Sequence, residues 1–370
     1  MNDSNNINNN IDNNVNTNVN TTEEVVSNTP DINDIDSTPL VGRRTNPDVA
    51  NLDNNEIEPK NKVSIFTIIV RIILVAIIFI LLFILLTKDG KQIIYRNFVN
   101  KIEISKFEPN KYYRARDYEY VQITNDFEAK DKQHLLNIYY TIVNSGANEF
   151  TFACSNSYKD CIDDVQEISN SEIILSNIKA FVHPFNGFTS IGTQYSTHGE
   201  VVLTIYKSYT SEEIKAVEKK MNQVIQELGI DLKDNTEIIK TYHDYIINNT
   251  KYDSVRSEEN IENYKSDIAY GPLIQGFALC GGYSEAMALF LDHYNIPNFR
   301  INSKTHIWNA VYLDGKWVHL DLTWDDPITT SGKDVLRNTY FLITTDELLT
   351  LEKSEHNFDK GVFSEFGDVI

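Results

Sequence analysis

The chain has 370 residues, a formal net charge of −20 at pH 7, and a hydrophobic content of 41%. Residues 1–60 carry 11 acidic and 3 basic residues, and the rest of the chain carries 42 acidic and 30 basic ones. An acid excess in both parts argues against nucleic acid and anionic surfaces as partners, because phosphates are bound by Lys and Arg.

The N-terminal segment, residues 1–62, is predicted to be a disordered tail. Asn fills 11 of its first 22 positions, and residues 1–60 contain no aromatic residue. A polar, low-complexity segment of this kind cannot bury enough apolar surface to offset the entropy lost on folding.

Residues 63–86 are predicted to form a transmembrane helix. Only Ser64, Thr67 and Arg71 interrupt these 24 residues, and about 20 apolar residues are enough to cross a bilayer. A cleaved secretory signal is the alternative, but some sixty polar residues precede the segment and Thr87-Lys88-Asp89-Gly90 contains no small-residue cleavage site. We therefore expect an uncleaved single-pass anchor in the cell membrane, with the bilayer as a partner.

The basic residues that flank this helix are nearly balanced between its two ends, so they set the orientation weakly. We expect the C-terminal part to lie outside the cell. Cys154 and Cys161 can form a disulfide in such a compartment; two reduced thiols are the alternative.

Two folded domains are predicted after the anchor. Residues 90–210 read as a small α+β domain of unknown role, with a helix over 131–143 and strands over 149–153 and 201–206. Residues 211–370 read as a second domain. It starts with the capping box Thr210-Ser211-Glu212-Glu213 and an apolar helical stripe that ends near Gly229, and a helix over 235–248 follows.

Cys280 is predicted to lie at the N-terminus of a helix. Apolar residues recur at helical spacing after Gly281, and Pro297 lies just beyond the expected end. The positive end of the helix dipole favours thiolate over thiol. A buried structural cysteine is the alternative.

A hairpin is predicted to bring His306 and Asp321 together. Residues 306–313 and 316–323 read as strands joined by Asp314-Gly315, a strong two-residue turn signal. In that register Trp308 lies opposite Asp321, and His306 is its diagonal neighbour on the same face. An Asp can then orient the imidazole toward a thiol. His319, opposite Ala310, is expected to be structural or to support the site, and the other six histidines, including His243 and His356, are expected to be structural or solvated.

Three segments carry a family resemblance: Cys280-Gly281-Gly282-Tyr283-Ser284-Glu285-Ala286, His306-Ile307-Trp308-Asn309, and the run from Trp317 to Pro327 with Asp321-Leu322-Thr323-Trp324-Asp325-Asp326-Pro327. Together they resemble the transglutaminase-like superfamily, and in particular its bacterial members, over about residues 234–330. The resemblance implies an α+β fold with a papain-type core, in which a helix bearing Cys280 packs on an antiparallel sheet bearing His306 and Asp321. It implies Cys280 as nucleophile, His306 as base and Asp321 as orienting carboxylate.

Several further residues are candidates for lesser roles. The backbone N–H of Cys280 is a natural oxyanion donor, and Gln275 is a candidate for the second. Trp308, with Trp317 and Trp324, forms either the hairpin core or an apolar wall that keeps water from a thioester. Asp325 and Asp326 precede a proline and are expected to form a turn. With no CxxC or HExxH spacing, we predict no metal and no cofactor.

Two function classes follow from these observations. One is a membrane-anchored cysteine enzyme that acts on a protein or peptide amide by transamidation or hydrolysis. The other is a cell-surface adhesion or scaffold protein that retains the fold without using the site. The intact order of Cys, His and Asp favours the enzyme.

Overall fold

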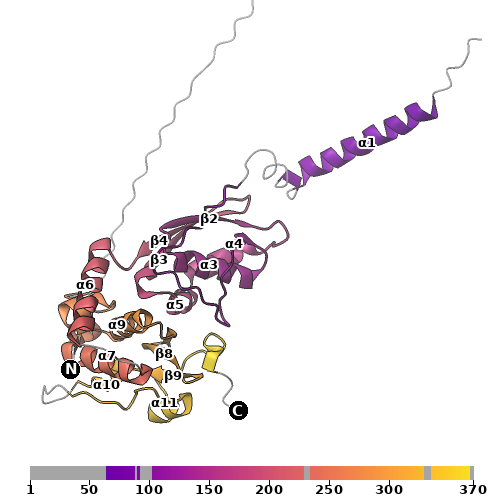
Figure 1. Ribbon diagram of the computed structural model, residues 1–370. Helices are drawn as coiled ribbons and strands as arrows, with labels where there is room; N and C mark the ends of the chain where they lie inside the picture. Colours follow the sequence, from indigo (N-terminus) through magenta and orange to yellow (C-terminus); the bar gives the residue numbers. More distant parts are fainter. Residues whose placement is uncertain (1–63, 88–89, 92–101, 229–233, 329–334, 367–370) are drawn as a thin grey trace, which may run out of the picture. The chain divides into compact units, whose positions relative to one another are not determined.

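The computed structural model describes residues 64–87, 90–91, 102–228, 234–328 and 335–366. The predicted tail, residues 1–62, lies outside the described residues. The described chain mixes helices and sheets, as the α+β prediction requires (Figure 1).

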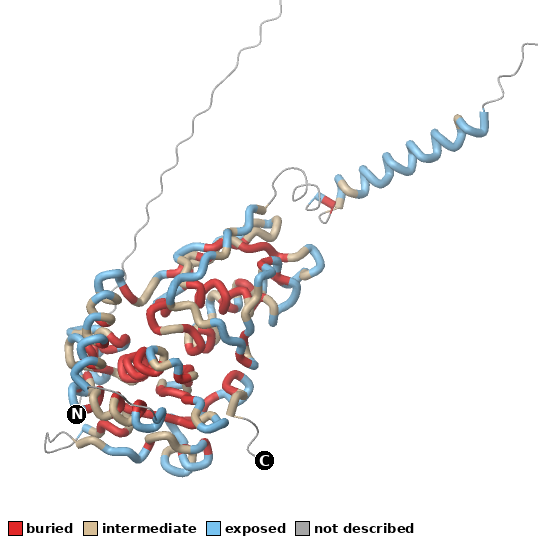
Figure 2. The backbone as a smooth tube through the Cα atoms, viewed as in Figure 1, coloured by how far each residue is buried: buried red, intermediate tan, exposed pale blue. Residues whose placement is uncertain are grey.

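Helix α1, Ile65–Leu86, matches the predicted apolar segment. In the described part of the chain it is the one helix long and apolar enough to cross a membrane, by length and composition. Its residues are exposed almost throughout (Figure 2). A helix that is apolar on every side is typical of a large protein core or of a membrane span.

The first sheet has the strand order β1-β2-β4-β3. β1 (Glu128–Ala129) pairs in parallel with β2 (Glu149–Cys154), whereas β4 (Glu200–Lys207) is antiparallel to β2 and to β3 (Phe188–Tyr195). Helices α3 (Lys132–Ser145) and α4 (Cys161–Asn170) pack on this sheet, and α5 (Glu172–Ala180) packs on α3, on α4 and on strand β7 (Asn298–Asn302).

Cys154 at the end of β2 and Cys161 at the start of α4 form a disulfide, with their Cα atoms 6.0 Å apart. Of the two alternatives left open by the sequence, the structure has the bridge rather than two thiols. It closes a short loop between β2 and α4, and α4 packs on β3 of the same sheet.

The second half is built around helix α9, Cys280–His293. The positions Gly282–Leu291 are all buried (Figure 2), because α9 packs against the sheet β7-β8-β9, helix α7 and the short helix α10. The remaining elements of the second half are α6 (Ser211–Glu227), α7 (Asn235–Asn249), β5 (Lys251–Tyr252), α8 (Ser254–Glu259), β6 (Phe277–Ala278), β7 (Asn298–Asn302), β8 (Ile307–Leu313), β9 (Lys316–Leu320), α10 (Leu322–Asp325) and α11 (Thr345–Leu351), with short helical turns at Gly271–Gln275 and Ser364–Phe366. A further single turn, Pro184–Asn186, lies in the first half between α5 and β3.

Hydrophobic packing crosses the predicted domain boundary at 210/211. One buried cluster joins the first sheet and its helices to side chains of the second half, including Phe299 of β7 and Trp308 of β8. The rings of Phe181 and Phe299, for example, lie 5.3 Å apart. The division into domains stays a prediction, and the two halves share this core.

The β8–β9 hairpin has the predicted register. Leu313 pairs with Lys316 and Ala310 with His319, while Asp314 and Gly315 take the positive φ values of 50° and 84° that a tight two-residue turn needs. The prediction that the second strand runs to Thr323 is wrong, because it ends at Leu320. The Asp321 carboxylate caps the backbone N–H groups of Thr323 and Trp324, which turns the chain into α10.

Candidate active site

Cys280 occupies the first turn of α9, as predicted, and it is partly exposed. The preceding strand β6 is held by parallel pairing with β5, so the helix start has a fixed position. A side chain at Gly281 would place its Cβ 2.6 Å from the Asp267 carbonyl oxygen, and one at Gly282 would collide with the Ser266 carbonyl. The two glycines therefore let the 266–267 loop lie directly on the helix start beside the thiol.

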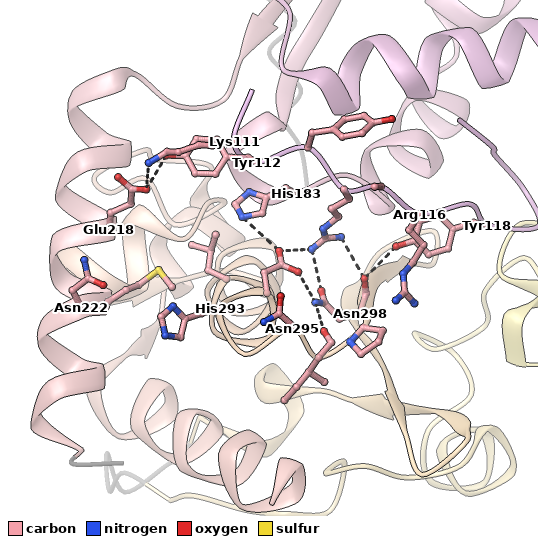
Figure 3. A pocket seen from close by; sticks show the side chains of 18 residues that line it. Lys111, Tyr112, Arg116, Tyr118, His183, Glu218, Asn222, His293, Asn295 and Asn298 are labelled. Atoms are coloured by element: carbon pink, nitrogen blue, oxygen red, sulfur yellow. Dashed lines mark hydrogen bonds and ion pairs between the residues drawn. The ribbon is translucent and has the colours of Figure 1, made fainter. Parts of the chain in front are cut away.

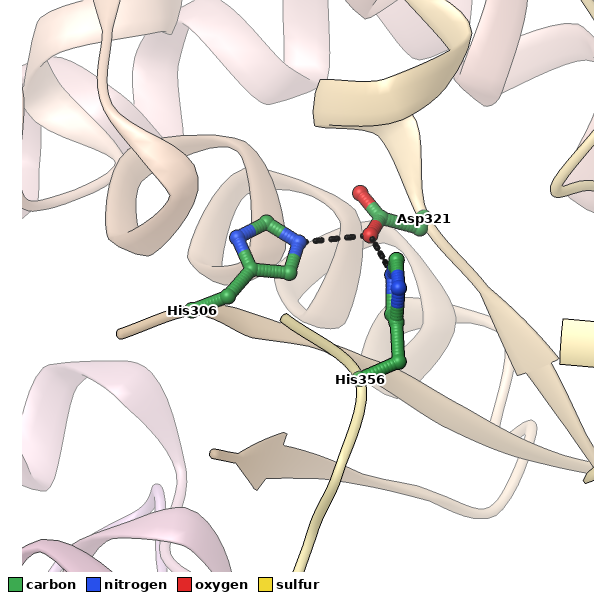
Figure 4. A group of neighbouring side chains, drawn as sticks. All are labelled: His306, Asp321 and His356. Atoms are coloured by element: carbon green, nitrogen blue, oxygen red, sulfur yellow. Dashed lines mark hydrogen bonds and ion pairs between the residues drawn. The ribbon is translucent and has the colours of Figure 1, made fainter. Parts of the chain in front are cut away.

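His306 and Asp321 meet at the open end of the hairpin, away from its Asp314-Gly315 turn. His306 directly precedes β8 and Asp321 directly follows β9. The imidazole Nε2–H donates to Asp321 Oδ2 at 2.6 Å (Figure 4), and the exposed fractions of the two residues are 5% and 1%. Because Nε2 is engaged by Asp321, Nδ1 is the nitrogen left for the thiol.

The three predicted residues interact electrostatically. Burial disfavours the charged form of His306, but Asp321 and then the Cys280 thiol, which is hydrogen-bonded to the imidazole, raise the pKa of His306 to about 10. Burial likewise opposes ionisation of Asp321, yet His306 and His356 hold the pKa of that carboxyl well below its usual range. His306 is therefore an imidazolium at neutral pH, and a cation beside a thiol favours its thiolate.

His356 is a member of this cluster that the sequence prediction missed. Its Nε2–H donates to the same Asp321 Oδ2, at 2.9 Å, and its side chain is fully buried (Figure 4). His356 was expected to be structural or solvated, and it is buried rather than solvated, because the chain returns after α11 and places the ring beside Asp321. No local pattern marks it: it lies 35 residues after Asp321 in a segment without regular periodicity.

His306, Asp321 and His356 offer ligand atoms within 4.8 Å of one another, so a metal site has to be weighed. Two ligands on a tetrahedral Zn²⁺ at about 2.0 Å lie about 3.3 Å apart. Here the two nitrogens lie 2.6 and 2.9 Å from the carboxylate oxygen, which are charge-assisted hydrogen-bond lengths. The distances fit a proton-bridged network better than a metal centre.

Trp308 and His319 lie behind the site. Trp308 is 1% exposed, its indole stacks on the His306 ring at 5.6 Å, and its Nε1–H donates to His319 Nδ1 at 3.0 Å. His319 Nε2–H then donates to Thr345, and burial, followed by the effect of His356, lowers the pKa of His319 to about 3. A buried neutral His319 thus fixes Trp308, and Trp308 supports the imidazole from beneath.

Gln275 is not held toward the thiol by its own hydrogen bond. Its amide oxygen accepts the backbone N–H of Lys265 at 2.8 Å, which ties the Gly271–Gln275 turn to the segment before it. Tyr252, which sequence reasoning did not select, lies closer to the chemistry: it pairs with Ala278, two residues before the cysteine. Burial raises the pKa of Tyr252, and so does the charge of Cys280, while a hydrogen bond to Ser257 lowers it; the net effect is a raised pKa, so the hydroxyl stays protonated and can donate.

Asp325 and Asp326 lie in a turn, as expected, and that turn is the end of the short helix α10. Asp325 ends α10, is fully buried, and accepts from His243 Nε2 at 3.2 Å and from the Tyr340 backbone at 3.0 Å. Asp326 accepts from the Tyr283 hydroxyl. Both carboxylates therefore fasten α10 to α7, α9 and the segment after it, which holds Asp321 in place.

A cavity of about 540 Å³ lies at the other end of α9 (Figure 3). Asp292, twelve residues after Cys280 and so roughly 18 Å along the helix, accepts from Arg114 Nη2 at 2.6 Å inside it. Lys111 pairs with Glu218 at 2.7 Å on the same wall. These ion pairs join the segment before the first sheet to α9 and α6, away from the thiol.

No family model matches the chain, and no curated protein matches it. Among solved structures it is similar to a TGase, at 16% identity and a TM-score of 0.28, over 37% of this chain and 45% of that one. It is also similar to a proposed cysteine protease from Cytophaga hutchinsonii, at 14% identity and a TM-score of 0.23, over 40% of this chain and 65% of that one. The chain thus spans less than two thirds of each.

Proposed function

We propose that the chain is a membrane-anchored cysteine enzyme of the transglutaminase-like type, which transfers the acyl group of a protein or peptide amide through Cys280. The observation that carries the proposal is the buried contact of His306 with Asp321, together with the influence of the Cys280 thiol on the pKa of His306. A buried imidazolium held between a carboxylate and a partly exposed thiol is the arrangement that activates a cysteine nucleophile.

In the first step, the Cys280 thiolate attacks the carbonyl carbon of the amide and the C–N bond breaks. His306 Nδ1–H gives its proton to the departing amine or ammonia, and a thioester remains. In the second step, an amine or a water attacks the thioester while His306 takes its proton. The C–S bond then breaks, and the thiolate and imidazolium are restored.

The developing oxyanion has two candidate donors. The first-turn N–H groups of a helix lack partners within the helix, and that of Cys280 lies at the reacting sulfur. The Tyr252 hydroxyl is the second, since its pKa is raised and it senses the charge of Cys280. We place Tyr252 ahead of Gln275, whose amide oxygen holds the Lys265 backbone.

The membrane assignment rests on α1 and the disulfide. A 22-residue apolar helix is long enough to span the bilayer, and a Cys154–Cys161 bridge persists in an oxidising compartment. Both support a single-pass protein with the domain after Leu86 outside the cell. An impermeant protease added to intact cells should then remove this domain, and its protection would reverse the orientation.

The reaction is tested with the full chain in detergent, a peptide containing internal glutamine, and a biotinylated primary amine. We expect ammonia release or amine incorporation that disappears in Cys280→Ala and falls by about 10³-fold or more in His306→Gln. Cleavage of the peptide backbone with the same dependence would identify a protease. Turnover that is unchanged in Cys280→Ala would refute the proposal.

A further inference from the structure

The Asp321 carboxylate accepts hydrogen bonds from two histidines rather than one. Its Oδ2 accepts from His306 at 2.6 Å and from His356 at 2.9 Å, while Oδ1 accepts the backbone N–H groups of Thr323 and Trp324. Orientation of a single imidazole requires only one of these bonds. The second histidine therefore needs its own explanation.

The contacts of His356 define its protonation. Nε2 faces the Asp321 carboxylate, and Nδ1 lies 3.1 Å from the Glu352 carbonyl oxygen and 3.5 Å from the Glu352 carboxylate. All of these atoms are acceptors. A neutral imidazole has one donor and one lone pair, so it would turn a lone pair toward an acceptor on one side; only the imidazolium satisfies both sides.

The environment of His356 suits a buried cation. Its ring is fully buried and stacks on Tyr340 at 5.5 Å, with Trp308 and Trp324 at 4.9 and 5.5 Å, and aromatic faces attract cations. The other titratable and charged groups that face it are Asp321 after β9, Glu352 after α11, His306 before β8, which lies 5.3 Å away ring to ring, and His319 on β9.

We infer that His356 is a positioning residue of the reaction: a second imidazolium that shares Asp321 with His306 and sets the pH range over which the Cys280–His306 ion pair persists. The inference rests on the proposed function of Cys280. Thiolate, His306 imidazolium, Asp321 carboxylate and His356 imidazolium then form a row of alternating charges that sums to zero.

The sign of the effect follows from this row. The positive charge of His356 stabilises the thiolate and opposes the positive charge of His306. Its removal therefore makes the thiol ionise at higher pH and makes His306 keep its proton to higher pH. Both limits of the range, the pH at which the thiol ionises and the pH at which His306 loses its proton, therefore move upward. The loss of a purely structural histidine would instead reduce the amount of active protein and leave both limits unchanged.

The test is the rate of Cys280 alkylation by iodoacetamide between pH 4 and 11 in the full chain, with Cys154 and Cys161 left oxidised. His356→Gln keeps a neutral N–H donor and removes the charge. His243→Gln is the matched control, since His243 is equally buried and pairs with Asp325 rather than Asp321. We expect both midpoints to rise by about one pH unit in His356→Gln and to stay in place in His243→Gln.

Midpoints that stay in place in His356→Gln, or that move downward, overturn the inference. A wild-type thiol that alkylates like that of the denatured chain contradicts the proposed function instead, so the two failures are distinguishable.

A second measurement uses the wild-type chain, so that it does not depend on whether the His356→Gln variant folds. Nitrogen-15 histidine spectra at pH 7.5, assigned residue by residue, should show both nitrogens protonated in the ring of His356 as well as in that of His306. A His356 ring with one unprotonated nitrogen would overturn the inference.

Discussion

At the scale of single residues, the hydrogen-bond partners of Asp321 explain why the site is built as it is. Four donors converge on one buried carboxylate: two imidazole nitrogens on Oδ2 and two backbone N–H groups on Oδ1. A buried charge is tolerated only when it is paired and hydrogen-bonded in this way. Asp321 can thus stay ionised with 1% exposure and keep His306 charged.

The raised pKa of His306 predicts how stability depends on pH. The pKa rises from an ordinary 6.5 to about 10 in the folded chain, so the stability it contributes is complete below pH 6.5 and is lost as pH rises toward 10. Thermal unfolding of Cys280→Ser and of Cys280→Ser with His306→Gln, from pH 6 to 10.5, measures this contribution without the thiol. The stability difference should shrink over that interval, and a constant difference would contradict the assignment.

The packing of Trp308 predicts its effect on the reaction. Because it is buried beneath His306 and bonded to His319, Trp308→Phe should cost about 1–3 kcal/mol of stability and slow both product-forming branches alike. The amine-to-water product ratio should not change. Trp317→Phe is the control, since Trp317 packs on Phe299 instead. A ratio that shifts toward hydrolysis only in Trp308→Phe would restore the apolar-wall role.

At the scale of elements, the start of α9 depends on two glycines. Gly282→Ala would force a Cβ into the Ser266 carbonyl, which should displace the helix start, cost about 1–3 kcal/mol and slow Cys280 alkylation.

Gly315→Ala is the matched change in the hairpin turn. Space around its Cβ is open, but φ is +84°, so we expect a loss of about 1–2 kcal/mol with unchanged alkylation. Equal alkylation rates in the two variants would show that the helix start tolerates a Cβ.

Elements with strong local signals were predictable from the sequence. The Asp314-Gly315 turn determined the hairpin register, and the Thr210–Glu213 capping box marked the start of α6. The end of β9 was misplaced because Thr323 and Trp324 have high strand propensity. The overriding interaction is the Asp321 cap, which holds their N–H groups in a helical turn.

Contacts between distant parts of the chain could not be read from the sequence. His356 reaches Asp321 only because the segment after α11 returns to the end of β9. The contact of Arg114 with Asp292 likewise could not be predicted from the sequence, because the two residues lie 178 positions apart. In both cases the tertiary fold, rather than a local pattern, determines which charges meet.

At the scale of the whole molecule, Arg114 ties the two halves together. Its guanidinium donates to Asp292 and to the Phe181 and Asn298 carbonyls, with an 11% exposed side chain. Arg114→Met leaves the partly exposed Asp292 carboxylate without that partner, so we expect a loss of about 1–3 kcal/mol in urea unfolding. Arg116→Met, at an exposed site on the same cavity, should change stability by less than about 0.5 kcal/mol. Similar losses in both would contradict the role of Arg114.

The central claim is that Cys280 carries an acyl group during turnover, and intact-protein mass spectrometry tests it most directly. The full chain is mixed with the glutamine peptide, quenched in acid within the first turnovers, and digested to locate any adduct. We expect a peptide-derived thioester on Cys280 that hydroxylamine releases and that is absent in Cys280→Ser. A folded chain that turns over the peptide with Cys280 unmodified under every quench time, or a peptide adduct on another residue, would contradict it.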